Sequence, residues 1–91
     1  MTETIFTFSS IVQTIQAEQH LLKAGMDVRV MPLPPDLRAG CWMCLRLPPS
    51  QTVDAQRFLQ ESGLAPQAIY TRTEDNGKSV FSVMNKESNG K

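Results

Sequence analysis

The sequence has little of what would indicate a charged, metallic or membrane partner. Nine basic and nine acidic residues balance to a net charge of zero, so no electrostatic footprint indicates a nucleic acid or an anionic lipid surface. One histidine and two cysteines offer few ligands for a zinc or iron–sulfur site. No apolar run approaches the roughly 20 residues that cross a bilayer, and the opening MTETIFTF lacks the features of a secretory signal. We therefore expect a cytoplasmic protein with free thiols and no cofactor, metal, nucleic-acid or membrane partner.

The hydrophobic content, 41% of the 91 residues, is enough for one domain with one core. Alternating polarity predicts strands, and two longer segments that end at Gly25 and Gly63 predict helices. The strands are expected at residues 3–8, 28–31, 42–47, 67–72 and 78–84, and the helices at residues 11–24 and 50–62. The polar residues 85–91 are expected to form a flexible tail.

An internal repeat predicts how these elements are arranged. QAEQHLLKAGM (16–26) aligns without a gap with DAQRFLQESGL (54–64), and each half of the chain has the order strand, helix, strand. Two right-handed βαβ units in tandem give an α+β, ferredoxin-like βαββαβ sandwich, with an antiparallel sheet and two helices on one face. We predict a single domain over residues 1–84, with its core at 3–72 and an added C-terminal hairpin strand at 78–84.

The two cysteines form a CxxC sequence, Cys41-Trp-Met-Cys44. In thioredoxin-like enzymes this motif begins a helix, where the helix dipole activates the first thiol. Here the flanking residues alternate as in a strand, so residues three apart point to opposite faces and the two thiols diverge. A catalytic dithiol and a metal site are the alternatives. We interpret Cys44 as a packing residue and consider Cys41 by itself.

Cys41 follows Gly40 at the end of the proline-rich loop PLPPDLRAG, where the chain returns to the sheet. A thiol at this place can be exposed, and Arg38 is close enough in sequence to favour the thiolate. Gly40 would allow another molecule to approach. These residues predict a persulfide or selenide acceptor. The alternative is that Cys41 is a small apolar residue that closes the core.

The first helix contains one unusual carboxylate, Glu18. It falls within the apolar stripe that we expect to face the core, while His20 lies on the opposite, polar side. A carboxylate in that stripe needs a charged or hydrogen-bonding partner, or else its stem reaches solvent. The residues that define the expected stripe are Ile11, Ile15, Leu21 and Leu22.

The sheet face without helices is the other notable feature. Met31, Trp42 and Tyr70 are expected on it. Apolar residues on an uncovered face indicate an interface or a covering segment. This face therefore predicts a homodimer, or a covering segment such as the C-terminal hairpin.

The chain also resembles a known family over residues 4–72. Ala17-Glu18, Leu21-Leu22 and Ala24-Gly25 match its helix signature, Pro32 and Pro34 its proline element, Cys41 its cysteine, and Leu45-Arg46 the end of its third strand. On these residues the sequence resembles the selenium/sulfur carrier protein-like family of small bacterial proteins. The chain departs from the family pattern at Pro35, Arg38-Ala39 and Trp42, and Trp42 replaces a glycine directly after the cysteine.

The resemblance implies a small carrier rather than a turnover enzyme. Cys41 would accept and relay a persulfide-type sulfur or selenium, with Arg38 and Gly40 in supporting roles and a cysteine desulfurase or selenium-pathway enzyme as partner. An indole at Trp42 is expected to crowd the thiol, so the chemistry could be altered or lost. The alternative function is a non-catalytic homodimeric interaction module that uses Met31, Trp42 and Tyr70. Small-ligand binding has only fold analogy behind it.

Overall fold

The computed structural model describes residues 1–86 and contains each strand and helix that the sequence predicts. The elements are β1 (Thr2–Thr7), α1 (Ile11–Lys23), β2 (Arg29–Pro32), β3 (Met43–Leu47), the 3₁₀ turn η1 (Pro49–Gln51), α2 (Thr52–Glu61), β4 (Ala68–Asp75) and β5 (Lys78–Lys86). β5 runs two residues beyond its expected end. The rest of the expected flexible tail, residues 87–91, lies outside the described residues.

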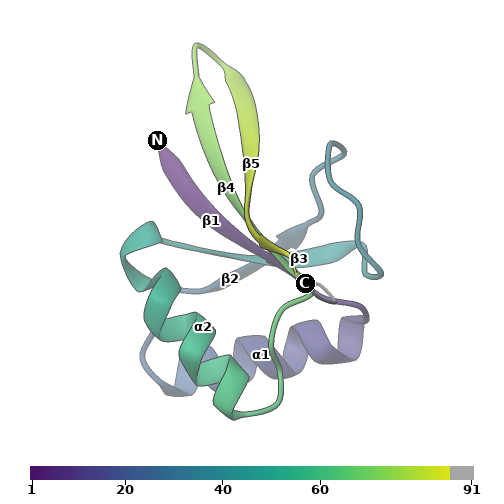
Figure 1. The fold of residues 1–91 in the computed structure, drawn as a ribbon, viewed down its shortest axis with the longest axis vertical. Helices are drawn as coiled ribbons and strands as arrows, with labels where there is room; N and C mark the ends of the chain where they lie inside the picture. Colours follow the sequence, from purple (N-terminus) through teal and green to yellow (C-terminus); the bar gives the residue numbers. More distant parts are fainter. Residues whose placement is uncertain (87–91) are drawn as a thin grey trace.

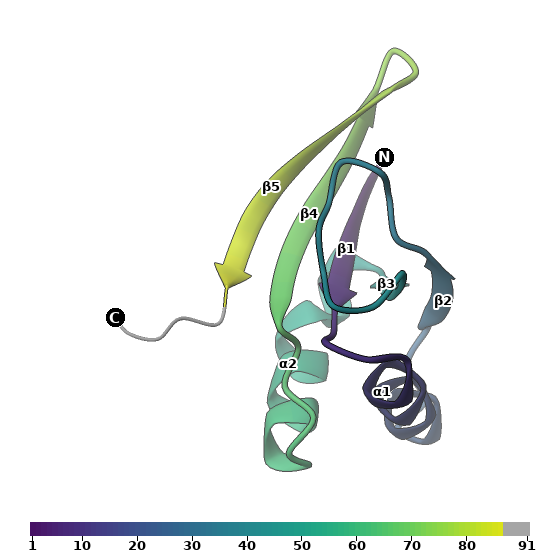
Figure 2. The ribbon, with the colours of Figure 1, turned by 90° about the vertical axis from the view of Figure 1, so that its right-hand side faces the viewer.

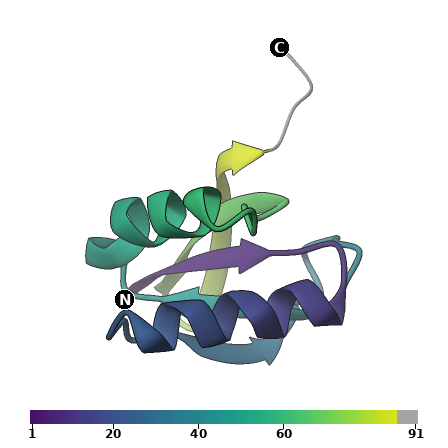
Figure 3. The same ribbon diagram turned by 90° about the horizontal axis from the view of Figure 1, so that it is seen from below.

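The five strands form one antiparallel sheet in the order β2-β3-β1-β4-β5 (Figure 1). In the first four strands, β3 lies between β1 and β2, and β1 lies between β3 and β4. This interleaving of two βαβ units is the ferredoxin-like arrangement that the internal repeat predicts. Both helices lie on the same face of the sheet (Figure 2), and they run side by side beneath it (Figure 3).

The β4–β5 hairpin extends the sheet and projects beyond the other strands (Figure 1). Its turn is Asn76-Gly77, and both residues have positive φ, 54° and 79°. A tight hairpin turn of type I′ needs positive φ at both central positions, which is why Asn-Gly is favoured there. The predicted hairpin strand is therefore confirmed.

Among the described residues, no helix is long and apolar enough to cross a membrane.

The main core lies between the helices and the sheet. Phe6, Leu45 and Ile69 come from three adjacent strands and are at most 2% exposed. Ala17 and Leu21 of α1, and Ala55 and Leu59 of α2, meet them. The two helices contribute the same residue types at equivalent positions, as the 38-residue repeat between 16–26 and 54–64 predicts.

The apolar stripe that we expected on α1 is wrong in part. Leu21 is buried, but Ile11 and Ile15 are each 40% exposed. The face that packs on the sheet is instead Thr14, Ala17 and Leu21, at the spacing i, i+3, i+7. Two of these side chains are small, so α1 lies close to the strands, and the Thr14 hydroxyl donates to the Ser10 carbonyl at 2.9 Å. The buried face of α1 is therefore the one that lets the helix lie close to the sheet, and not the one with the largest side chains.

Glu18 is half-buried at the edge of that packed face. It makes no ion pair with any residue that the structure describes. Of the two expectations for this carboxylate, the arrangement matches the one in which its stem reaches solvent. His20 is exposed, as expected, and its ring lies 6.3 Å from that of Phe58.

The opposite face of the sheet is only partly open. Residues 33–41, here called the covering loop, leave β2 and return to β3. Leu37 of this loop is buried against Ile5 and Cys44 of the sheet, and Leu33 packs beside them. The partly buried sheet residues of this second cluster are Met31, Tyr70 and Phe81. A covering segment is therefore present in the chain itself, but it is this loop and not the expected C-terminal hairpin, which extends the sheet instead.

Candidate functional site

The covering loop positions the candidate thiol. At its start, the Leu33 N–H donates to the Trp42 carbonyl at 2.8 Å, which ties the two ends of the loop together. Within it, the Leu37 N–H donates to the Pro34 carbonyl at 3.0 Å and forms a turn that drives Leu37 into the second cluster. The loop is thus anchored by its middle and by its base. Cys41 lies at the point where it re-enters the sheet.

Cys41 is only 3% exposed, so the exposure that we expected for this thiol is not found. Its sulfur faces α1 and lies 3.5 Å from Thr14 Oγ1 and 3.4 Å from the Met43 N–H, and both groups donate to Sγ. Thr14 shares its single proton with the Ser10 carbonyl. The burial follows from the position of the loop end, because Gly40, the residue before Cys41, lies against Ser9 just before α1. The sulfur therefore lies in a small polar niche at the edge of the main core.

Gly40 has a role different from the expected one of giving access. A Cβ at this position would lie 2.4 Å from the Ser9 carbonyl oxygen and 2.9 Å from the Ser9 Cα. These are backbone atoms that cannot swing away, so only glycine lets the loop sit against the connection between β1 and α1. The Gly40 N–H also faces Gln67 Oε1 at 3.5 Å. Gly40 therefore holds the loop end, and Cys41 with it, against the body of the domain.

Arg38 is exposed on the covering loop. No hydrogen bond or ion pair joins it to Cys41 or to another residue in the described range 1–86. Its expected influence on the thiol stays a prediction.

Trp42, the neighbour of Cys41, is 72% exposed, so most of the indole surface faces solvent and not the thiol. Met31 and Tyr70 are half-buried in the second cluster instead of forming an open patch with it.

Cys44 lies on the other face of the sheet from the main core, fully buried in the second cluster. Its Sγ is 3.8 Å from the Pro32 carbonyl. The pKa of the Cys44 thiol is raised from 9.0 to about 12, mainly by burial and also by the nearby Cys41, while Arg72 partly offsets the rise. Both cysteines are free, and residues 1–86 contain no cluster of metal-ligating side chains. The expected packing role of Cys44 fits this environment.

The raised pKa makes a testable prediction about Cys44. At pH 9 an ordinary thiol is half ionised, whereas only about one Cys44 in a thousand is a thiolate. Iodoacetamide should therefore alkylate Cys44 very slowly in the folded protein at pH 9, as measured by mass spectrometry of peptides. Because unfolding returns the pKa toward 9.0, the unfolded state releases its proton first, and this thiol lowers the free energy of unfolding as pH rises above 9. Urea-unfolded protein is the control, and equally fast labelling of both states would contradict the assignment.

A charge cluster on the face opposite the helices was not anticipated. Glu3 of β1 is 90% buried in its side chain and lies between Arg46 Nη1 at 2.6 Å and Arg72 Nη2 at 2.7 Å. The Arg46 contact is a hydrogen bond. The Arg72 contact is an ion pair without hydrogen-bond geometry, which leaves Glu3 Oε1 without a hydrogen bond. Because side chains alternate along a strand, Glu3 lies on the same face of β1 as Ile5, and this alternation is the sequence signal that could have placed Glu3 there.

The chain matches, over residues 3–71, the family described as "Putative Se/S carrier protein-like". It is 44% identical over 55 residues to an uncharacterized protein, YtiA, of Escherichia coli (strain K12), an alignment that covers 58% of this chain and 65% of that protein. The matched part of the chain thus spans just under two-thirds of the relative's length. No solved structure matches. Because the family match extends from β1 into β4 and includes the covering loop with Cys41, the chain belongs to the Se/S carrier protein-like family.

Proposed function

We propose that the protein carries sulfur or selenium on Cys41, as a carrier and not as a turnover enzyme. The donor is a cysteine desulfurase or a selenium-pathway enzyme that holds the transferable atom as a persulfide or its selenium counterpart. The observation that carries the proposal is the placement of Cys41: a free thiol in the matched region, at a loop end, with two donors directed at its sulfur.

The chemical step needs no oxidant. The Cys41 thiolate attacks the outer sulfur of a donor persulfide, R–S–SH, and a new sulfur–sulfur bond forms at Sγ. The donor's own sulfur–sulfur bond breaks, and its inner sulfur leaves as a thiolate. The product is Cys41–S–SH, with the outer sulfur in the same oxidation state as before. A thiolate on the acceptor repeats the exchange and regenerates Cys41, so atoms and electrons balance at each step.

The niche around Cys41 suits this exchange. The Met43 N–H and the Thr14 hydroxyl are hydrogen-bond donors directed at Sγ, and they hold the sulfur in one position. Arg38 adds a positive charge on the exposed surface of the same loop. Gly40 fixes the loop end against Ser9 so that the thiol returns to one position.

Because Cys41 is 3% exposed, transfer requires the loop end to move away from α1. Besides the packing of Gly40 on Ser9, two hydrogen bonds join the thiol end of the loop to the rest of the domain: Gly40 N–H to Gln67 Oε1 at 3.5 Å and Thr14 to Sγ at 3.5 Å. The first is long for an N–H···O bond, and the second uses sulfur, which is a weak acceptor. Leu37 and the Leu33–Trp42 hydrogen bond hold the rest of the loop in place. A donor enzyme therefore needs to displace only the last residues of the loop, about 38–41, to reach the sulfur.

Mass spectrometry tests the carrier proposal. After incubation with a cysteine desulfurase and cysteine, the folded protein should gain the mass of one sulfur atom, and peptide mapping should place it on Cys41. Cys44→Ser is the matched control, because it removes the deeply buried thiol and should retain the adduct. Cys41→Ser should lose it. No adduct on the wild-type protein, or equal labelling of the two variants, would overturn the proposal.

A homodimeric interaction module remains a second candidate on one observation. Trp42 is 72% exposed, and a solvent-facing tryptophan beside the functional loop is typical of a contact surface. Such a module has no need of a thiol. The sulfur adduct therefore separates the two candidates, because only the carrier gains it.

A further inference from the structure

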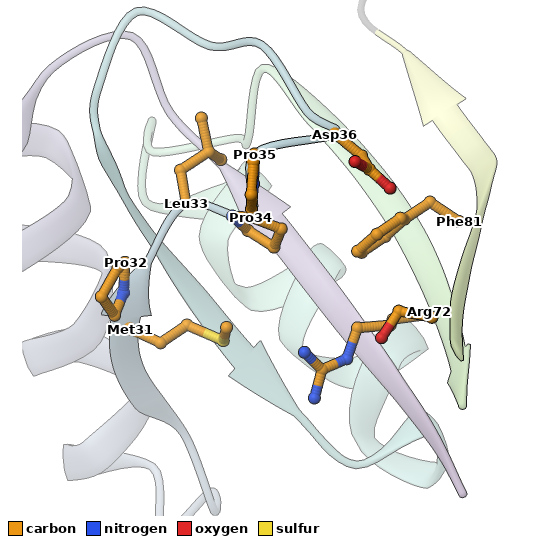
Figure 4. A pocket seen from close by; sticks show the side chains of 9 residues that line it. Met31, Pro32, Leu33, Pro34, Pro35, Asp36, Arg72 and Phe81 are labelled. Carbon is orange, nitrogen blue, oxygen red and sulfur yellow. The ribbon is translucent and has the colours of Figure 1, made fainter. Parts of the chain in front are cut away.

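A pocket of about 460 Å³ lies on the face opposite the helices, between the start of the covering loop and the β4–β5 hairpin (Figure 4). This volume is in the range of small-molecule sites. Apolar side chains form most of its wall, and the chief among them are Met31, Leu33, Pro34 and Phe81. Two charged residues also line it, Arg72 of β4 and Asp36 of the loop. Apolar walls with a few polar groups are typical of sites for small organic ligands.

Arg72 supplies a positive charge that the protein leaves partly unused. Its Nη2 lies 2.7 Å from Glu3, but Glu3 also neutralises Arg46, so one carboxylate serves two guanidinium groups. A guanidinium carries five N–H donors, and no hydrogen bond from the Arg72 side chain to another described residue is found. The side chain is 23% exposed, and Figure 4 shows its guanidinium directed across the pocket floor toward Met31.

Phe81 and Asp36 also line the pocket. Phe81 is the cross-strand partner of Arg72, so the ring and the guanidinium lie on the same sheet face. Asp36 is exposed at the rim and is drawn next to Phe81 in Figure 4. It forms no ion pair within residues 1–86. The pocket is thus lined by one cation, one anion and the apolar side chains around them.

We propose that this pocket binds a free α-amino acid with an apolar side chain. The ligand carboxylate binds the unused donors of Arg72, its ammonium group faces Asp36, and its side chain packs on Met31, Pro34 and Phe81. A ligand with only negative charge would be repelled by Asp36, and one with only positive charge by Arg72. The site lies on the opposite face of the sheet from the helix-side niche of Cys41, and it does not depend on sulfur transfer.

Titration with L-leucine, followed by ¹H–¹⁵N NMR, tests the site. Saturable shifts are expected in the amides of the lining residues that carry an N–H, which are Met31, Leu33, Asp36, Arg72, Ser79 and Phe81, because the three prolines of the pocket give no amide signal. L-Leucinamide lacks the carboxylate and should bind roughly tenfold more weakly or worse, since a charge-assisted hydrogen bond is lost. 4-Methylpentanoate lacks the ammonium group and should bind up to about fivefold more weakly, because Asp36 is exposed. Equal binding of leucine and leucinamide, tighter binding of 4-methylpentanoate, or no shift at about 10 mM ligand would each overturn the proposal.

Two arginine variants separate a binding role from a structural one. Arg72→Gln removes the pocket cation and should weaken leucine binding roughly tenfold or more. Arg46→Gln is the matched control, because Arg46 contacts the same Glu3 but does not line the pocket. It should bind leucine as the wild type does. A similar loss in both variants would mean that Arg72 acts only through Glu3, and it would overturn the assignment.

Discussion

Replacing Gly40 with alanine is expected to destabilise the protein by roughly 2–3 kcal/mol, because overpacking against atoms that cannot move has a cost of this size. The new Cβ would meet the Ser9 carbonyl oxygen at 2.4 Å and the Ser9 Cα at 2.9 Å. The loop end must then move outward and take Cys41 with it. For a domain of this size the melting temperature should fall by roughly 10–20 °C, as measured by circular dichroism. Below that temperature, iodoacetamide should label Cys41 faster than in the wild type.

Gly25→Ala is the control for this variant. Gly25 has a positive φ of 82°, and a Cβ added there would meet nothing within 4 Å, so its replacement tests backbone strain without a steric clash. That strain is worth about 1–2 kcal/mol, and it should leave the labelling rate of Cys41 unchanged. If Gly40→Ala were as stable as the wild type, or if both variants labelled Cys41 equally fast, the loop end would not be held by the Ser9 contact.

Most of the fold could be predicted from the sequence, because its determinants are local or repeated. Alternation in β1 and the Asn76-Gly77 turn each indicate one structure, and the repeat at 16–26 and 54–64 relates the two halves. Once two βαβ units are recognised, handedness and short connections leave few topologies. The expected five-stranded antiparallel sheet with both helices on one face follows from these constraints, and the structure has it.

The buried face of α1 could not be predicted in the same way. The helix has more apolar residues than one face can hold, so periodicity alone does not choose among them. Ile11 and Ile15 are the larger side chains, yet Thr14 and Ala17 face the sheet. The choice depends on how closely the helix approaches the strands, and that is a property of the whole sandwich.

The sequence separates the two thiols, but it does not show the surroundings of Cys41. Strand alternation separates Cys41 from Cys44, and the structure places the first beside Thr14 and the second against Pro32. The burial of Cys41 depends on a contact between Gly40 and Ser9, which are 31 residues apart in the sequence, and no local pattern reports such a contact. A loop between strands has few local determinants, so its path is fixed by tertiary packing.

The covering loop connects the two faces of the domain. Its first residues form a wall of the pocket that contains Arg72, and its last residue is the candidate sulfur acceptor. Leu37, between them, is buried on the sheet. The loop therefore has a fixed middle and two ends, one beside the Arg72 guanidinium and one at the Cys41 thiol. A proline-rich segment suits a loop that is held in this way, because proline reduces the conformational entropy that the unfolded chain loses on folding.

Replacing Glu3 with glutamine is the other substitution with a large expected effect. Glu3 is the shared counter-charge of Arg46 and Arg72, and its side chain is 90% buried. Glutamine preserves the shape but leaves two guanidinium groups near one another without an anion. Breaking a buried ion pair has a typical cost of about 3–5 kcal/mol. Because the arginines are 35% and 23% exposed, water screens part of this, and we expect a loss of roughly 2–3 kcal/mol in urea unfolding.

Glu18→Gln is the matched control, since Glu18 is a half-buried carboxylate with no ion pair in the described part of the chain, and its replacement should change stability by less than about 0.5 kcal/mol. A double-mutant cycle then isolates the interaction itself. If Glu3 stabilises the fold through Arg72, the effects of Glu3→Gln and Arg72→Gln should not add, because either change removes the same contact. The double variant should lose less than the sum of the two single losses. Full additivity would mean that the ion pair between Glu3 and Arg72 does not contribute to stability.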